Sequence, residues 1–118
     1  MAGVSEVMNI IGDVAGRHCV MVDDLADSAG TLCNAADALL NAGALSVVAY
    51  VTHAVLSPGA AERIAASRLE SLVATDSIAA DAATQACPKI RRISIAGLFA
   101  DAIREIDSDG SISRLNLR

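Results

Sequence analysis

Aromatic residues are almost missing from this 118-residue chain, at 2 % of the sequence. Proteins that bind single-stranded nucleic acids stack the bases on interleaved aromatic side chains, and this sequence offers no such surface. A surplus of basic residues is missing too: the formal net charge is −5, whereas a nucleic-acid module presents a basic face. The sequence therefore predicts no nucleic-acid partner.

Long apolar runs are also lacking. No stretch approaches the roughly 18 uninterrupted apolar residues that a membrane-spanning helix requires. A basic segment followed by a short apolar core, which would predict a secretory signal, is not visible either. These features predict a cytoplasmic protein with no membrane partner.

The cysteines and histidines lack the spacing of a metal site. Cys19, Cys33 and Cys87 are odd in number, far apart and without a CxxC pair, which disfavours both zinc binding and a disulfide framework. We expect them to be small buried hydrophobic residues. His18 and His53 have no cysteine or carboxylate at ligand spacing, so a structural or surface role is expected, and no metal ligand is assigned.

Apolar residues, many of them alanine, make up 53 % of the chain, which suits thin α/β layers in one domain over residues 1–118. Apolar runs alternate with stretches of helical periodicity. Residues 76–89 read as a loop with one helical turn, and residues 107–118 resist assignment. This order of elements predicts an α/β fold with a parallel sheet flanked by helices. Strands are predicted at residues 6–11, 18–22, 45–52, 72–75 and 90–95, and helices at residues 31–41, 60–67 and 98–106.

Small and polar residues follow the strand predicted at residues 18–22, where open α/β sheets bind their ligands. We expect Gly30 to adopt a positive φ and Ala29 to leave the backbone open to a ligand. Successive N–H groups at the start of the next helix can then form an anion-binding nest, and Ser28 and Thr31 add hydroxyl groups. The segment reads Asp23, Asp24, Leu25, Ala26, Asp27, Ser28, Ala29, Gly30, Thr31.

The three aspartates of this segment need a separate explanation. Each would repel an adjacent phosphate by about 1 to 4 kcal/mol, depending on the local dielectric. That cost is tolerable if Asp23 and Asp24 accept hydrogen bonds from sugar hydroxyls, with a divalent cation nearby. An ordinary strand-to-helix loop with a helix cap is the alternative, but two aspartates that directly end a strand, followed by D-S-A-G-T, favour a phosphoribosyl site.

Residues 22–32 resemble the PRPP-binding motif of the type I phosphoribosyltransferase fold, in the form found in ribose-phosphate pyrophosphokinases (PRPP synthetases). The resemblance extends collinearly from about residue 5 to residue 115 and implies an incomplete domain from the C-terminal half of that enzyme. It implies that Asp23 and Asp24 hold the ribose hydroxyls and that Asp27, Ser28, Ala29, Gly30 and Thr31 form the 5-phosphate loop. The segments that carry it are residues 7–14, 49–53, 75–78, 87–91 and 98–104.

The same resemblance implies transfer of pyrophosphate from ATP to ribose 5-phosphate, with Mg²⁺, in a homo-oligomer. Ser111 and Ser113 match a serine pair implicated in a regulatory phosphate or ADP site between subunits. Members of the family are more than twice as long, and their N-terminal domain, pyrophosphate loop and Lys/Arg-rich loop have no counterpart here. We therefore assign no catalytic residue, and expect an inactive isolated chain with an exposed sheet edge and a tendency to self-associate.

Two other functions stay open at this point. A nucleobase phosphoribosyltransferase uses the same loop to bind PRPP, although its loop usually reads T-G-G-T. A non-catalytic regulatory subunit that assembles with active PRPP synthetase subunits would also keep this sequence.

Overall fold

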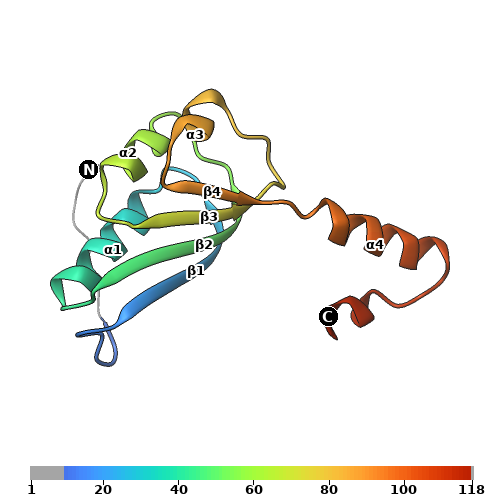
Figure 1. Ribbon diagram of the computed structural model, residues 1–118, viewed down its shortest axis with the longest axis horizontal. Helices are drawn as coiled ribbons and strands as arrows, with labels where there is room; N and C mark the ends of the chain where they lie inside the picture. The colour runs from blue at the N-terminus through green and yellow to red at the C-terminus, as the bar shows by residue number, and fades with distance from the viewer. Residues whose placement is uncertain (1–9, 118) are drawn as a thin grey trace.

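The structure is a computed structural model that describes residues 10–117. One sheet of four parallel strands, in the order β1-β2-β3-β4, alternates with helices along the chain (Figure 1). The predicted α/β class and the parallel sheet are therefore confirmed. The elements are β1 (His18–Ala26), α1 (Gly30–Asn41), β2 (Ser46–Ala54), α2 (Ala60–Ala66), β3 (Ser71–Thr75), α3 (Ala82–Ala86), β4 (Ile90–Ile93), α4 (Ala96–Asp107) and a final 3₁₀ helix (Ile112–Leu117).

The first two strand predictions differ from the structure. The strand predicted at residues 6–11 lies mostly outside the described residues, and its described end, Ile10 and Ile11, is not in a strand. Strand β1 continues four residues beyond Val22 because β2 keeps pairing with it as far as Ala26 and Ala54. The predicted end of this strand, at residue 22, is therefore wrong, and both aspartates belong to β1.

The core lies between one face of the sheet and helices α1 and α2. Alternate residues of β2, namely Val47, Ala49 and Val51, are buried on this face, as a strand with one covered side requires. Ile64 of α2 is fully buried against them. Many of the other core positions are alanine, so the helices lie close to the sheet with little side-chain volume between the layers.

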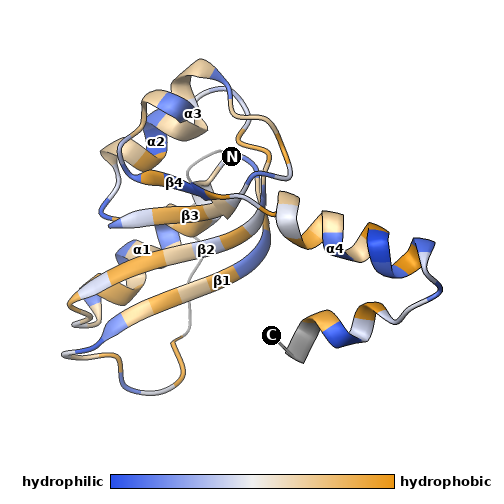
Figure 2. Ribbon diagram, turned by 45° about the vertical axis from the view of Figure 1, so that its right-hand side comes forward, coloured by the Kyte–Doolittle hydropathy of each residue, from blue (hydrophilic) through white to orange (hydrophobic). Residues whose placement is uncertain are grey.

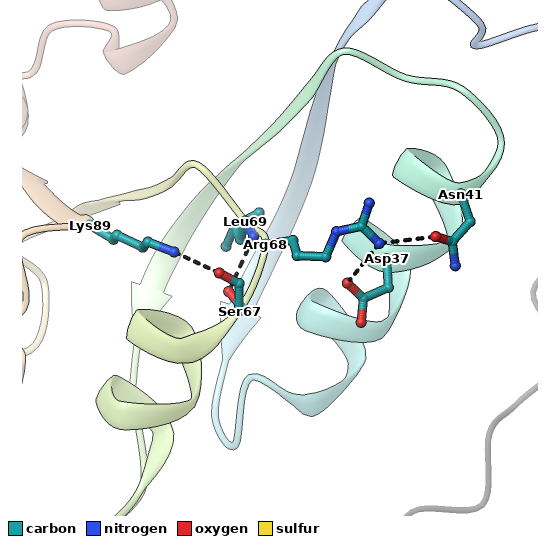
Figure 3. Close-up of polar contacts among 6 residues, drawn as sticks. All are labelled: Asp37, Asn41, Ser67, Arg68, Leu69 and Lys89. Carbon is teal, nitrogen blue, oxygen red and sulfur yellow. Dashed lines mark hydrogen bonds and ion pairs between the residues drawn. The ribbon is translucent and has the colours of Figure 1, made fainter.

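Polar contacts fasten the helices where strands β2, β3 and β4 begin (Figure 3). Lys89 Nζ, just before β4, donates to the Ser67 carbonyl oxygen at the end of α2 (2.6 Å). Arg68 Nη1 donates to Asn41 Oδ1 at the end of α1 (2.9 Å). Both are hydrogen bonds from a charged donor to a neutral oxygen, one exposed and one half-buried, and a hydrogen bond in a folded protein contributes about 0.5 to 1.5 kcal/mol net. They lie at the amino-terminal ends of the strands, whereas the predicted ligand loop lies at the carboxyl-terminal ends.

The other face of the sheet is open among the described residues. Val22 of β1 is 80 % exposed, and its register partner Tyr50 on β2 is 45 % exposed. Val20 and Ile93 are more than half exposed as well. No helix of residues 10–117 packs on this apolar surface (Figures 1 and 2).

Helix α4 extends away from the sheet and buries none of its residues (Figure 1). One side of it is apolar, and Leu98, Phe99, Ile103 and Ile106 are all more than half exposed. The radius of gyration is 16.9 Å, against about 13.5 Å for a compact domain of this length. None of the helices among residues 10–117 is long and apolar enough to cross a membrane.

A carboxylate fixes the start of α4 to the end of β3. Asp76 Oδ1 accepts a hydrogen bond from the Ile95 N–H (2.9 Å), and the Asp76 N–H donates to the Ile93 carbonyl (3.0 Å). The bond from the Ile95 N–H is the main reason why the pKa of Asp76 lies below its ordinary value.

Replacing this carboxylate should change how stability depends on pH. Because the folded pKa of Asp76 is lowered, its contribution is complete above the unfolded pKa of about 3.9 and is lost as the pH falls through the folded value. Urea unfolding between about pH 5 and pH 3 should show a steeper loss of stability in the wild type than in Asp76→Asn. Parallel pH profiles would contradict this role.

The two faces of the sheet should respond differently to the same substitution. Val47→Ala removes two methyl groups from a fully buried site and should lower the free energy of unfolding by about 2 kcal/mol. Val22→Ala, on the open face, should change it by no more than about 0.5 kcal/mol. Chemical denaturation of both variants measures the difference, and equal losses would mean that the open face is covered in solution.

Candidate functional site

A cavity of about 240 Å³ lies at the carboxyl end of β1, beside the start of α1. Its lining includes Asp23, Asp27, Ser28, Ala29 and Thr31. These are five of the seven residues predicted to bind ribose 5-phosphate. The two others, Asp24 and Gly30, do not line it, and Leu25, Ala26 and Leu32 complete the wall.

The two aspartates of β1 lie on opposite faces of the sheet. Successive side chains alternate along a strand, so Asp23 shares the helix-covered face with its register partner Val51, and Asp24 shares the open face with Val22. The Asp24 N–H donates to Asp23 Oδ1 (2.8 Å) and so orients that carboxylate. That Asp23 and Asp24 both hold the ribose hydroxyls stays a prediction. Of the two aspartates of β1, Asp23 lines the cavity and Asp24 does not, while Asp27 of the loop lines it as well.

The residue with a positive φ in the loop is Ala29, not Gly30. Ala29 has φ 66° and caps the N-terminus of α1, whereas Gly30 is the first helical residue. A left-handed conformation costs a non-glycine residue about 1 to 2 kcal/mol. The Ala29 side chain is buried in the core, so packing of its methyl group offsets part of that cost. A left-handed residue next to a helical one turns successive N–H groups toward the same side, which is the backbone geometry of a nest.

The first turn of α1 presents donors without a side-chain cap. Ser28 Oγ accepts only a long hydrogen bond from the Gly30 N–H (3.3 Å), and Ser28 and Thr31 are both exposed. The N–H groups of a first helical turn have no intrahelical partner, and the helix dipole makes them partly positive. This end of α1 therefore favours a negatively charged group.

The connection between β2 and α2 forms backbone hydrogen bonds with the loop. The Val55 and Leu56 N–H groups both donate to the Ala26 carbonyl (3.0 and 3.1 Å), and the Ser57 N–H donates to the Asp27 carbonyl (3.0 Å). These bonds end β1 and turn the chain toward α1.

Strands β2 and β3 end in a hydroxyl-rich cluster that sequence reasoning did not single out. Thr75 Oγ1 donates to the Thr52 carbonyl (2.6 Å), and a hydrogen bond joins His53 Nδ1 and Ser77 Oγ (2.8 Å). His53 is exposed, in agreement with its predicted surface role. The available signal was positional, because polar residues follow consecutive strands at the edge where parallel sheets bind ligands.

The cysteines are packing residues. Cys33 and Cys87 are buried, which confirms the prediction for them, and Cys19 is half-buried. Burial raises the pKa of the Cys33 thiol, so this side chain stays protonated near neutral pH. Within residues 10–117, no three or more histidine, cysteine, aspartate or glutamate side chains are grouped to hold a metal ion.

Ser111 and Ser113 lie in the C-terminal segment, about 80 residues after the loop between β1 and α1. Both serines are exposed, and Arg114 next to them pairs with Glu105 of α4. In Figures 1 and 2 this segment lies below α4 and apart from α1 and α2. Their regulatory role between subunits stays a prediction.

The chain is thus an α/β protein with a cavity at the carboxyl ends of its parallel strands, next to a helix N-terminus that favours negative charge. A model of the phosphoribosyl synthetase-associated domain matches residues 2–117. The chain belongs to this family.

Individual relatives agree with that assignment. The chain is 60 % identical over 113 residues to a ribose-phosphate pyrophosphokinase of Caulobacter vibrioides (strain NA1000 / CB15N), covering 96 % of this chain and 36 % of the relative. It is 57 % identical over 114 residues to the enzyme of the same name from Maricaulis maris (strain MCS10), covering 97 % and 37 %. The chain thus spans little more than a third of the length of these curated relatives.

A solved structure supports the same family. Phosphoribosylpyrophosphate synthetase from Mycobacterium smegmatis superposes with a TM-score of 0.80 at 33 % identity, covering 85 % of this chain and 33 % of that one. The resemblance stated from the sequence is therefore confirmed, and the fold agrees with a phosphoribosyltransferase-like sheet.

Substitutions at Ala29 should reveal the left-handed cap. Ala29→Val places a β-branched side chain at φ 66° in a buried site and should destabilise the chain by about 2 kcal/mol. Ala29→Gly relieves the backbone but loses a buried methyl group, so it should stay within about 1 kcal/mol of the wild type. Urea unfolding of both variants tests this, and equal effects would argue against the left-handed conformation.

Proposed function

We propose that this chain is the ribose-5-phosphate-binding part of a ribose-phosphate pyrophosphokinase. The observation that carries the proposal is the cavity at the end of β1, where the nest at Ala29 adjoins the Asp23 carboxylate. A donor-rich nest suits a phosphate, and an acceptor carboxylate suits sugar hydroxyls. The family match supports the same ligand.

In this site the phosphate rests on the start of α1, with Ser28 and Thr31 donating from their hydroxyl groups. Asp23 accepts hydrogen bonds from the ribose. Asp24 acts through its N–H, which holds the Asp23 carboxylate in place. Asp27 lies on the cavity wall at the edge of the phosphate position and limits how close the phosphate comes.

Pyrophosphate transfer from ATP depends on lysine, arginine and Mg²⁺ charge at the reacting oxygens. The described residues that line the cavity include no lysine or arginine. They also form no three-ligand metal group, and Mg²⁺ commonly binds to one or two carboxylates plus substrate phosphates. We infer that the cations and the ATP site come from the parts of the longer relatives that this chain does not span.

The surfaces left open support assembly. The apolar face of the sheet and the apolar side of α4 are exposed over residues 10–117, and large exposed apolar patches mark interaction surfaces. We propose that these surfaces join copies of the chain in a homo-oligomer, and that the protein is cytoplasmic.

Ligand titration tests the proposal directly. Isothermal titration should show that the chain binds ribose 5-phosphate more tightly than inorganic phosphate, and inorganic phosphate more tightly than ribose. Asp23→Asn and Thr31→Val should each weaken ribose 5-phosphate about tenfold, the effect of losing a hydrogen bond that involves a charged group.

Ser108→Ala is the matched control, because it removes an exposed hydroxyl at the end of α4, outside the cavity, and should leave the affinity unchanged. No binding of ribose 5-phosphate by the folded chain would overturn the proposal. Formation of AMP from ATP and ribose 5-phosphate by the purified chain would overturn the inference that the ATP site lies elsewhere.

A further inference from the structure

Three successive carbonyl groups of the phosphate loop are bonded to one neighbouring segment, residues 55–63. Backbone N–H groups of that segment bond the Ala26 and Asp27 carbonyls. The third carbonyl, that of Ser28, has a different donor: Arg63 Nη1 of α2 lies 2.7 Å from it. A side chain thus completes a series that the backbone begins.

These bonds fix the direction of the loop N–H groups. The described peptide bonds are all trans, and in a trans peptide the C=O of one residue and the N–H of the next point in opposite directions. Since the three carbonyls face the segment 55–63, the N–H groups of Asp27, Ser28 and Ala29 face away from it. Within residues 10–117, no acceptor binds the N–H of Ser28 or Ala29.

Of these three peptide groups, Ser28–Ala29 is the one whose carbonyl accepts no backbone hydrogen bond and depends on the Arg63 side chain. It directly precedes the left-handed Ala29, and rotating it would turn the Ala29 N–H out of the nest. Without Arg63, the Ser28 carbonyl is exposed to water, which is an equally good partner in either orientation. A guanidinium group is always charged, and hydrogen bonds from charged donors are stronger than neutral ones.

We propose that Arg63 is a positioning residue for phosphate binding: it holds the Ser28–Ala29 peptide so that the Ala29 N–H points to the ligand. Arg63 does not line the cavity that we assign to ribose 5-phosphate, so it acts through the loop rather than by contact. It lies instead in the groove between α1 and α2, with Gly30 and Cys33. This inference rests on the proposed function for the identity of the ligand, but not for the peptide orientation.

The test combines ligand titration with amide NMR of the ligand-free chain. Arg63→Met should weaken ribose 5-phosphate about tenfold, and in the free protein it should shift the Ala29 amide resonance and change its HN–Hα coupling. Arg63→Lys should retain most of the affinity, because the contact is a single bond to a carbonyl rather than a two-pronged one. If Arg63→Met fails to fold, Arg63→Gln replaces it, since its shorter side chain does not reach Ser28.

Arg68→Met is the matched control. It removes the same charge from an exposed arginine that bonds Asn41 at the other end of α1, so its affinity and its Ala29 amide should equal those of the wild type. Equal weakening by both substitutions would show a general charge effect and would overturn the proposal. So would an unchanged Ala29 amide in Arg63→Met.

Failure of the proposed function gives a distinct result. The wild-type chain would then bind no ribose 5-phosphate, while the Ala29 amide would still respond to Arg63→Met and recover in Arg63→Lys. That outcome would support the positioning role of Arg63 and assign the nest to another ligand.

Discussion

The geometry of the site depends on the pairing of β1 with β2 up to Ala26 and Ala54. This pairing keeps Asp23 and Asp24 extended, so that one carboxylate reaches the cavity and the other reaches the open face. It ends where the Val55 and Leu56 N–H groups both bond the Ala26 carbonyl. From that point the chain turns through Ala29 into α1, and the donors of the first helical turn meet the cavity.

The charges that line the cavity suit ligand binding but not pyrophosphate transfer. The cavity wall carries carboxylates and hydroxyls, which suit a sugar, and a nest of N–H groups, which suits a phosphate. Arg63 serves the loop through a carbonyl bond and stays outside the cavity. This composition suits the sugar phosphate that we propose as the ligand, whereas moving a pyrophosphoryl group requires cations at the reacting oxygens.

Several features of the fold were predictable because they depend on local sequence. The apolar runs at Val47 to Val51 and Leu72 to Ala74 form strands, and Gly43, just after the C-cap of α1, has the positive φ (104°) that glycine tolerates. The helix that became α4 was also predictable, but its lack of a packing partner among the described residues was not. Periodicity identifies an apolar face and says nothing about which surface covers it.

The sequence by itself determined the α/β class, the alternation of strands and helices from β1 to α4, the family and the position of the loop between β1 and α1. Each of these depends on residue type and spacing along the chain. Only the tertiary structure decided that β1 includes both aspartates, that Ala29 rather than Gly30 adopts the left-handed conformation, and that Arg63 reaches Ser28. Each of these depends on partners distant in sequence: the β2 backbone, the core that surrounds the Ala29 methyl group, and the placement of α2. No local pattern reports such contacts.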